Sequence, residues 1–123
     1  MKNLNYQTPQ SSMRLNSINS LLKKEISRVI TTQVKDPRLS NWVSINHVKT
    51  SKDLQNATAY ISIMGDKIQK HKTLKALRSA SKFIQVILHK ELSLKRIPNI
   101  TFIEDDSFEK AEIISKLLDS NKS

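Results

Sequence analysis

Apolar residues recur at steps of three and four over the first third of the chain, the spacing that places them on one face of a helix. The series is Leu15, Ile18, Leu22, Ile26, Val29 and Ile30. It predicts an amphipathic helix that begins near Ser12, with Ser11 or Ser12 as its N-cap. Asp36-Pro37 ends this helix, because the residue before a proline avoids helical torsion angles.

Apolar and polar residues alternate in the next part of the chain, as they do in a strand with one buried face. The alternation is imperfect from Trp42 to Val48 and clean from Asn56 to Met64. The loop Ser51-Lys52-Asp53-Leu54 between these two strands predicts an antiparallel hairpin. A third strand is predicted over Asn99 to Glu104, after Pro98 ends the helical pattern that precedes it.

The longest helical pattern runs from Lys67 to Arg96, after Gly65 and Asp66, which serve as a break and a cap. This stretch is long for one globular helix. The small residues Ser79-Ala80-Ser81 near its middle predict a kink or a break into two helices.

Helical spacing divides this long stretch into two opposite faces. The face expected to pack on the rest of the domain comprises Leu77, Ala80, Ile84, Ile87, Leu88 and one acid, Glu91. The opposite face comprises His71, Lys75, Arg78, Lys82, Gln85 and His89. The second face is a basic stripe that suits a polyanion.

The final segment begins with Asp106-Ser107-Phe108-Glu109, which has the form of a capping box. Ala111, Ile114, Leu117 and Leu118 then mark a short last helix. The order of elements predicts an α+β domain with a three-stranded sheet covered by helices on one face. We expect a flexible N-terminal arm over residues 1–10, one folded domain over residues 11–118 and a frayed tail over residues 119–123.

The charge balance of the whole chain indicates which partners the basic stripe suits. The chain of 123 residues has a formal net charge of +10 and a pI near 10.0. Such a charge favours nucleic acid, an anionic membrane or an acidic protein as the partner. Aromatic residues are only 5% of the chain, so base stacking is poorly provided for and recognition of RNA shape and backbone is expected. The candidate RNA-binding residues are Lys67, Lys70, Lys75, Arg78, Lys82, Lys90, Lys95 and Arg96.

Residue types and spacings disfavour enzymatic and metal-binding functions. The chain has no cysteine, and its single glycine cannot build a nucleotide-gripping glycine loop. His47, His71 and His89 lack metal-ligand spacing. Asp105 and Asp106 suit a helix cap better than acid-base chemistry. We therefore expect no metal, no cofactor and no catalytic residue.

Membrane association is disfavoured by the same kind of evidence. No apolar run is long enough to span a bilayer, and the N-terminus lacks an apolar secretory core, so a cytoplasmic protein is expected. The basic stripe lacks the flanking Trp or Phe anchors of a membrane-surface helix. Asp36 and Asp53 are expected to hydrogen-bond their own turns, and Trp42 to lie in the core or at a sheet edge.

Three motifs in the expected order make the chain resemble the ribosome-binding factor A family from about Arg14 to Leu118. The first is Asp36-Pro37-Arg38-Leu39 after the first helix. The second is Ser51-Lys52-Asp53-Leu54 followed by Ala57 and Tyr60-Ile61-Ser62. The third is Leu94 to Ser107, with Pro98, Phe102, Asp105 and Ser107 at the family's spacing.

The resemblance implies a type-II KH-like fold in which an Ala-x-Gly kink separates two helices. That motif aligns with Ala80-Ser81-Lys82, so lysine replaces the family's glycine and the kink must form without it. Gln85 stands where the family usually carries arginine, which removes one expected phosphate contact. Lys82 is placed to compensate for that loss electrostatically.

The resemblance also implies a function. The expected role is a non-enzymatic assembly factor that binds the immature small (30S) ribosomal subunit and its 16S rRNA, assists rRNA processing and takes part in cold adaptation. A monomer is expected, because the sequence shows no exposed apolar stripe that demands a dimer. The alternative is a small basic RNA-processing enzyme of the nuclease type. Such an enzyme would need a convergent His, Lys and carboxylate site, which the sequence does not reveal.

Overall fold

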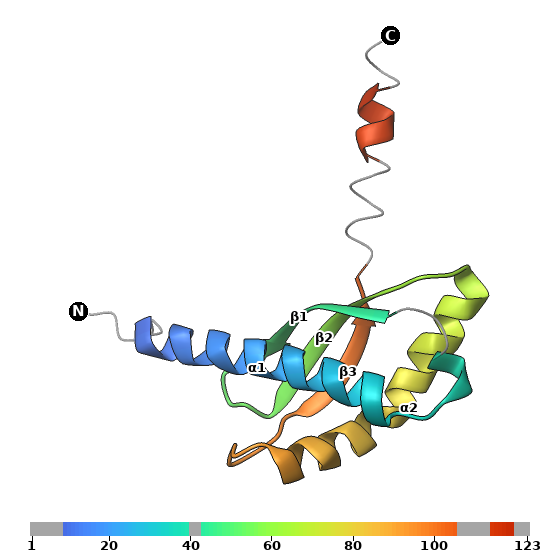
Figure 1. Ribbon diagram of the computed structural model, residues 1–123. Helices are drawn as coiled ribbons and strands as arrows, with labels where there is room; N and C mark the ends of the chain where they lie inside the picture. The colour runs from blue at the N-terminus through green and yellow to red at the C-terminus, as the bar shows by residue number, and fades with distance from the viewer. Residues whose placement is uncertain (1–8, 40–42, 106–113, 120–123) are drawn as a thin grey trace.

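The computed structural model describes residues 9–39, 43–105 and 114–119. The elements follow one another as α1 (Pro9–Gln33), the short 3-10 helix η1 (Pro37–Leu39), β1 (Val43–Thr50), β2 (Asn56–Ile63), α2 (Lys67–Glu91) and β3 (Asn99–Glu104). Residues 114–119 are also helical. This is the predicted order of helices and strands (Figure 1).

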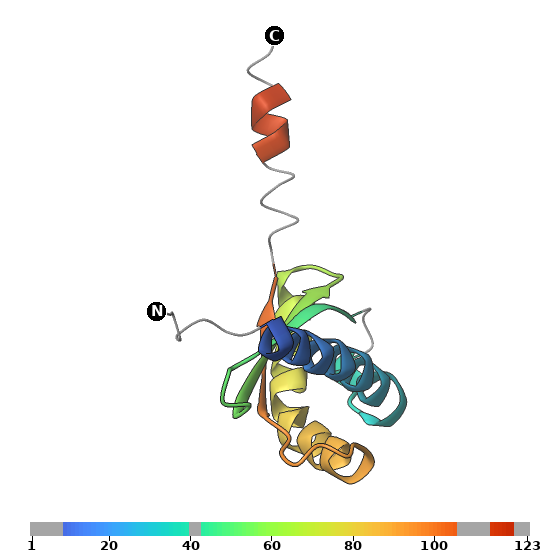
Figure 2. The same cartoon turned by 90° about the vertical axis from the view of Figure 1, so that its left-hand side faces the viewer.

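The sheet has three strands in the order β1-β2-β3. β1 and β2 form the predicted antiparallel hairpin, whereas β3 runs parallel to β2. A parallel neighbour requires a crossover, which α2 provides. Figures 1 and 2 show α1 and α2 on the same face of the sheet. The α+β architecture with helices on one face is therefore confirmed.

The core lies between this sheet face and the two helices. Its fully buried side chains include Leu22 and Ile26 of α1, Leu77 of α2, Ile61 of β2 and Phe102 of β3. Each of the helical residues belongs to an apolar series that the sequence placed on an inward face. Burial of these faces, more than helix propensity, holds the helices in place.

The start of α1 differs from the prediction. The helix begins at Pro9, so Ser11 and Ser12 lie inside it and neither is its cap, and Pro9 and Gln10 are not part of an arm. Proline is favoured in a first helical turn, where its missing N–H has no intrahelical partner to lose. Residues 1–8 of the expected arm lie outside the described residues.

The strand ends also differ slightly from the prediction. β1 extends to Thr50, beyond the expected Val48, and β2 ends at Ile63. The irregular alternation in β1 reflects a register shift between Ile45 and His47, which adds one residue to this strand relative to β2. Trp42 lies outside the described residues.

Of the two alternatives predicted for this long stretch, the kink is present (Figure 1) and the break into two helices is not, because α2 is one helix from Lys67 to Glu91. Its axis changes direction near the middle, between the two halves visible in Figures 1 and 2. The helix also ends earlier than expected. Leu92 is extended and donates its N–H to the Leu88 carbonyl, so Lys95 and Arg96 lie in the α2–β3 loop.

The last helix is present over residues 114–119, and its apolar residues Ile114, Leu117 and Leu118 are exposed. Asp119 belongs to this helix and not to a frayed tail. The predicted capping box at residues 106–109 and the tail beyond Asp119 lie outside the described part of the chain.

Candidate nucleic-acid interface

The exposed side of α2 carries a row of lysine, arginine and histidine side chains, which we call the basic face of α2. Its members are Lys67, His71, Lys72, Lys75, Arg78, Lys82, His89 and Lys90, all of which are exposed. The opposite side of the helix buries Leu77, Ile84 and Leu88 in the core. The predicted basic stripe is therefore present, and the alignment of Lys75, Arg78 and Lys82 on one exposed surface is confirmed.

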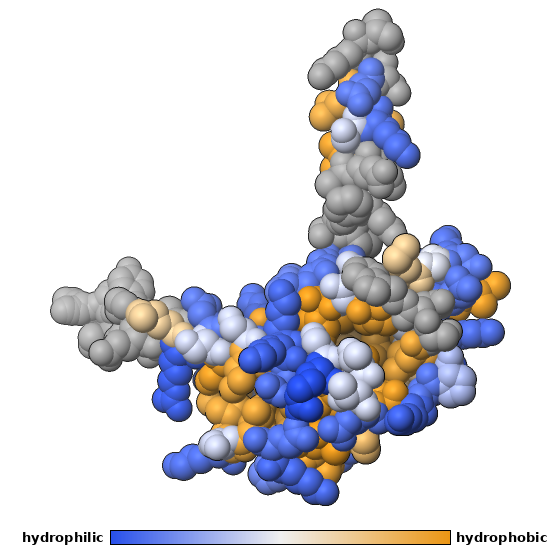
Figure 3. Space-filling model, viewed as in Figure 1, coloured by the Kyte–Doolittle hydropathy of each residue, from blue (hydrophilic) through white to orange (hydrophobic). Residues whose placement is uncertain are grey.

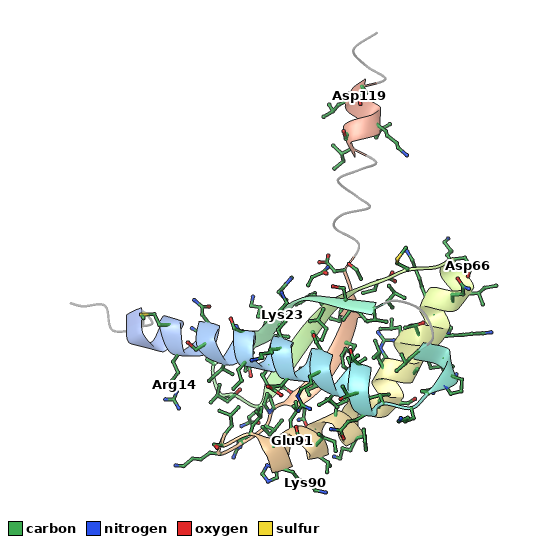
Figure 4. The ribbon with its side chains drawn as sticks, in the orientation of Figure 1. Arg14, Lys23, Asp66, Lys90, Glu91 and Asp119 are labelled. Atoms are coloured by element: carbon green, nitrogen blue, oxygen red, sulfur yellow. The ribbon has the colours of Figure 1, made fainter. Side chains whose placement is uncertain are left out.

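Glu91 is the only acid between Lys67 and Arg96, and it is engaged by α1. Its carboxylate pairs with the Arg28 guanidinium and accepts a 3.5 Å hydrogen bond from Gln33 Nε2. Arg28 also pairs with Glu25 at 2.8 Å, and the hydrogen bonds that Arg28 donates to the Glu25 and Glu91 carboxylates raise its pKa. Figure 4 labels Glu91 and Lys90 at the end of α2. The one acid of this stretch thus neutralises a cation of α1 and not the basic face.

Two side chains of α2 reach the outer edge of β3. Ser81 donates its hydroxyl hydrogen to the Ile100 carbonyl, and Arg78 Nη2 lies 3.5 Å from the Phe102 carbonyl. These contacts satisfy acceptors on a strand that has no further neighbour in the described sheet. Arg78 remains exposed despite this contact, so its charge stays available to an anion.

Gln85 differs from the prediction, because its side chain does not belong to the open stripe. Gln85 Nε2 donates to the Ile97 carbonyl at 3.0 Å and lies 3.3 Å from the Pro98 carbonyl and from Asn99 Oδ1. The amide thus binds the chain where it enters β3. An arginine here would place a charge against the same carbonyls.

The remaining candidate cations fall into two groups. Lys70 is half-buried and its Nζ lies 3.6 Å from Glu104 Oε2, so this lysine is separate from the basic face. Lys95 and Arg96 are exposed on the α2–β3 loop. The pKa of Asp53 is lowered by hydrogen bonds from Ser51 and Gln55 and also by the charge of Arg96, which places Arg96 near the β1–β2 turn.

The kink motif Ala80-Ser81-Lys82 forms three successive residues of a continuous helix. Ala80 is partly buried against the core, Ser81 binds β3, and Lys82 is exposed on the basic face. A residue on the exposed face of a helix needs no unusual torsion angle. Lysine is therefore compatible with this position.

The turn acids have the structural roles that were predicted. Asp36 Oδ1 accepts a 2.9 Å hydrogen bond from the Arg38 N–H, and Asp36 Oδ2 lies 2.6 Å from Arg38 Nη2. Asp53 Oδ1 accepts hydrogen bonds from Ser51 Oγ at 2.7 Å and from the Gln55 N–H at 3.1 Å. Both carboxylates therefore fix the turns in which they lie.

The described part of the chain contains neither a candidate metal site nor a candidate membrane span. No three His, Cys, Asp or Glu side chains within residues 9–39, 43–105 and 114–119 are grouped so that they could hold a metal ion. In the same part of the chain, no helix has the length and apolar character needed to cross a bilayer.

No local sequence pattern predicts that Arg14 lies beside Lys95 and Arg96. These three cations line one pocket together with the β1–β2 turn. Arg14 is on the first helix and the other two are on a loop more than half the chain away, so no local spacing connects them. Only the packing of α1 on the sheet brings them together.

These features define the class: a small basic α+β domain that presents a cationic helix face. The family model described as ribosome-binding factor A matches residues 14–118, and the chain belongs to that family. The resemblance recognised in the sequence motifs is therefore confirmed.

Relatives and solved structures agree with this assignment. Ribosome-binding factor A of Dictyoglomus thermophilum is 40% identical over 105 residues, which are 85% of this chain and 88% of that relative. The solution structure of a Thermotoga maritima candidate ribosome-binding factor A has a TM-score of 0.69 and 29% identity, over 83% of this chain and 94% of that chain.

A third comparison concerns the fold alone. A Thermus thermophilus ribosome-binding factor A, described as fitted into the cryo-EM map of its complex with the 30S subunit, has a TM-score of 0.59 and 23% identity. The match covers 72% of this chain and 91% of that one.

Proposed function

We propose that this protein is a non-enzymatic assembly factor that binds the immature small (30S) ribosomal subunit and contacts 16S rRNA through the basic face of α2. The observation that carries the proposal is the exposed row of cations on α2, whose only acidic neighbour in the same stretch is bound to Arg28. Membership of the ribosome-binding factor A family supports it. The Thermus thermophilus relative described in a 30S complex supports the choice of subunit.

The basic face of α2 suits the phosphate backbone of RNA better than its bases. Lysine and arginine neutralise phosphates and release counterions, whatever the base sequence. The exposed Lys75, Arg78 and Lys82 are spaced along one surface of the helix, so they can follow successive phosphates. Lys67 and Lys90 extend the same face toward the two ends of α2. The protein is therefore expected to recognise the spatial arrangement of RNA phosphates and not the base sequence.

The mechanism that we infer is a shift in the population of rRNA conformations. A protein that binds one conformation more tightly than another increases the share of the first. An immature subunit offers rRNA arrangements that the mature subunit lacks. By holding one of them, the protein would assist rRNA processing without performing the cleavage itself.

Co-sedimentation with purified immature and mature small subunits over a salt series tests the proposal. We expect wild-type protein to bind the immature particles more tightly, with an affinity that falls steeply as salt rises. A Lys75/Arg78/Lys82 triple alanine variant should lose this binding. The matched control is a Lys23/Lys24/Lys35 triple alanine variant, which removes the same charge from exposed positions outside α2.

Either of two results would overturn the assignment. If the two triple variants bind equally, net charge and not the basic face of α2 determines binding. If wild-type protein fails to sediment with subunits even at low salt, the partner is a different polyanion. Cleavage of naked precursor rRNA by the purified protein would contradict the non-enzymatic role.

A further inference from the structure

A pocket with a volume of about 440 Å³ lies between α1, the β1–β2 turn and the α2–β3 loop. Its apolar lining consists of Ile18, Leu21, Leu54, Leu94 and Pro98. Figure 3 shows hydrophobic surface below the N-terminal half of α1, bordered by hydrophilic residues. Volumes of this size are typical of sites for small organic ligands or for one unit of a polymer.

Hydrogen bonds hold the walls of this pocket in place. Asn19 Oδ1 on α1 accepts a 2.9 Å hydrogen bond from the Thr50 N–H at the end of β1. In the turn, the Leu54 N–H donates to the Ser51 carbonyl at 2.9 Å. Leu54 has a φ of +61°, which is uncommon for a residue other than glycine. A conformation of this kind is a strained feature of the type found at binding sites.

The pocket wall includes a buried polar group without a partner. Thr50 is only 6% exposed, and its Oγ1 has no hydrogen-bond partner in the described part of the chain. A buried hydroxyl is ordinarily hydrogen-bonded, because losing water without a replacement is costly. A ligand in the pocket could supply the partner after rotation about the Thr50 Cα–Cβ bond.

Three cations are among the residues that line the pocket, namely Arg14, Lys95 and Arg96. Arg14 extends from the N-terminal half of α1 in Figure 4. The charge of Arg96 contributes to the lowered pKa of Asp53, but the Asp53 carboxylate already accepts hydrogen bonds from Ser51 and Gln55. The charge around the pocket therefore favours a ligand with an anionic group.

The α2–β3 loop connects this pocket to the basic face of α2. Lys95 and Arg96 also line a second, more open hollow of about 320 Å³, whose other wall includes Val86 and His89 of α2. Basic side chains therefore continue from His89 of α2 through Lys95 and Arg96 of the loop to the pocket. An RNA strand on the basic face of α2 could follow this path.

We propose that the pocket binds one unstacked nucleotide. The base would lie on the apolar lining, with one edge toward the Thr50 hydroxyl, and the phosphate would lie between Arg14, Lys95 and Arg96. Arginine guanidinium planes can also stack on an exposed base. An acidic peptide could satisfy the charges, but a flat rigid base fills a pocket at a lower cost in conformational entropy. The pocket proposal rests on the proposed function in one respect only, namely that the nucleotide belongs to an RNA strand.

Amide NMR spectra of the isotopically labelled full chain test this proposal. The probes are the nucleoside 5′-monophosphates, a short single-stranded oligonucleotide of mixed sequence and an acidic apolar peptide. We expect nucleotides to shift the amide signals of residues 14–21, 50–54 and 93–97. Tighter binding of the oligonucleotide than of any mononucleotide identifies an RNA strand as the source, whereas equal affinities identify a free nucleotide.

Matched variants locate the binding. Ser17→Trp places a large ring at the pocket, and it should abolish the shifts, whereas Ser20→Trp on the same helix lies outside the lining and should leave them unchanged. Arg14→Ala should weaken nucleotide binding about tenfold, because one charge-assisted hydrogen bond is lost. Lys24→Ala is its control.

Equal nucleotide binding by the Ser17→Trp and Ser20→Trp variants would overturn the proposal. So would amide shifts that the peptide causes and that none of the nucleotides causes. The two proposals fail separately. The Lys75/Arg78/Lys82 triple alanine variant should retain the nucleotide-induced shifts in the pocket even though it no longer binds the subunit. Retention of subunit binding by that variant contradicts the proposed function and leaves the pocket proposal intact.

Discussion

Gly65 has a φ of +129°, a backbone conformation that side chains other than glycine's rarely adopt. A Cβ atom at this residue would lie 2.5 Å from Gln69 Oε1 and 3.0 Å from Gln69 Cβ. Gln69 forms a capping box with Asp66, since its Oε1 accepts from the Asp66 N–H at 3.1 Å and its N–H donates to Asp66 Oδ1 at 2.8 Å. Gly65 therefore controls both the chain reversal after β2 and the start of α2.

We predict that Gly65→Ala lowers the free energy of unfolding by about 2 kcal/mol, through backbone strain and loss of the capping box. Urea denaturation followed by circular dichroism measures this change. Asp66→Ala is the control, because it removes the cap alone and should cost about 1 kcal/mol. Equal losses in the two variants would show that the backbone conformation of Gly65 contributes nothing.

Asp36 has a strongly lowered pKa. Hydrogen bonds from the Arg38 side chain, followed by the Arg38 N–H, lower the pKa of Asp36 from 3.8 to about 2. A pKa that is lower in the folded than in the unfolded state means that the ionised form is stabilised by folding. This stabilisation is complete above the unfolded pKa and is lost as the pH falls toward 2.

We predict that the unfolding midpoint of the wild type falls more than that of Asp36→Asn as the pH decreases from about 4 to about 2. Carboxyl NMR titration of the wild type should give an Asp36 pKa of about 2. In Arg38→Ala the Asp36 pKa should return toward 3.8, its ordinary value. An unchanged pKa in that variant would exclude the Arg38 side chain as the cause.

At the scale of elements, α2 performs two tasks with opposite faces. Its apolar face closes the core over the sheet, and its exposed face carries the cations. Side chains at the boundary between the faces, Ser81 and Gln85, bind carbonyls of β3 and of the chain entering it. These contacts fix α2 against the edge strand without using the exposed cations.

Lys82, where the resemblance implies a glycine, gives a prediction about α2. Because Lys82 lies within a continuous helix, Lys82→Gly should lower the free energy of unfolding by about 0.5–1 kcal/mol, the ordinary cost of an interior helical glycine. Chemical denaturation measures the change, with Lys75→Gly on the same face as the control. Stabilisation by Lys82→Gly alone would indicate that the backbone at this residue favours glycine.

For the whole molecule, the central property is the distribution of a net charge of +10. In the described part of the chain, four acids form ion pairs: Glu25 and Glu91 with Arg28, Asp36 with Arg38, and Glu104 with Lys70. The basic face of α2 contains none of the cations in these pairs. Self-repulsion along that face is relieved when a polyanion binds.

We predict a specific salt dependence for subunit binding. Each phosphate neutralised adds slightly less than one unit to the slope of log affinity against log salt concentration. Loss of three such contacts in the Lys75/Arg78/Lys82 triple alanine variant should reduce the slope by about 2 to 3 units. Binding titrations at several salt concentrations measure the slope. For the triple variant they use the residual binding that remains at low salt. A reduced affinity with an unchanged slope would mean that these cations do not contact phosphate.

The sequence by itself determined the elements and their inward faces. Two spacings were sufficient to predict the inward faces: steps of four and three for Leu22, Ile26 and Val29, and alternation for Ala57, Ala59 and Ile61. Residues that recur with the period of a helix or a strand lie on the same face of that element. Local hydrogen bonding also made the roles of Asp36 and Asp53 predictable. The basic face of α2 followed from the same helical period.

Only the tertiary structure decided which charges stay available and where the loops meet. Glu91 is engaged by Arg28, and Lys70 by Glu104, through contacts between elements distant in sequence. The end of α2 at Glu91 depends on the path that the chain takes to β3, which no residue in the helix specifies. The pocket that joins Arg14 to Lys95 and Arg96 likewise exists only after α1 packs on the sheet, since local patterns carry no information about such distant contacts.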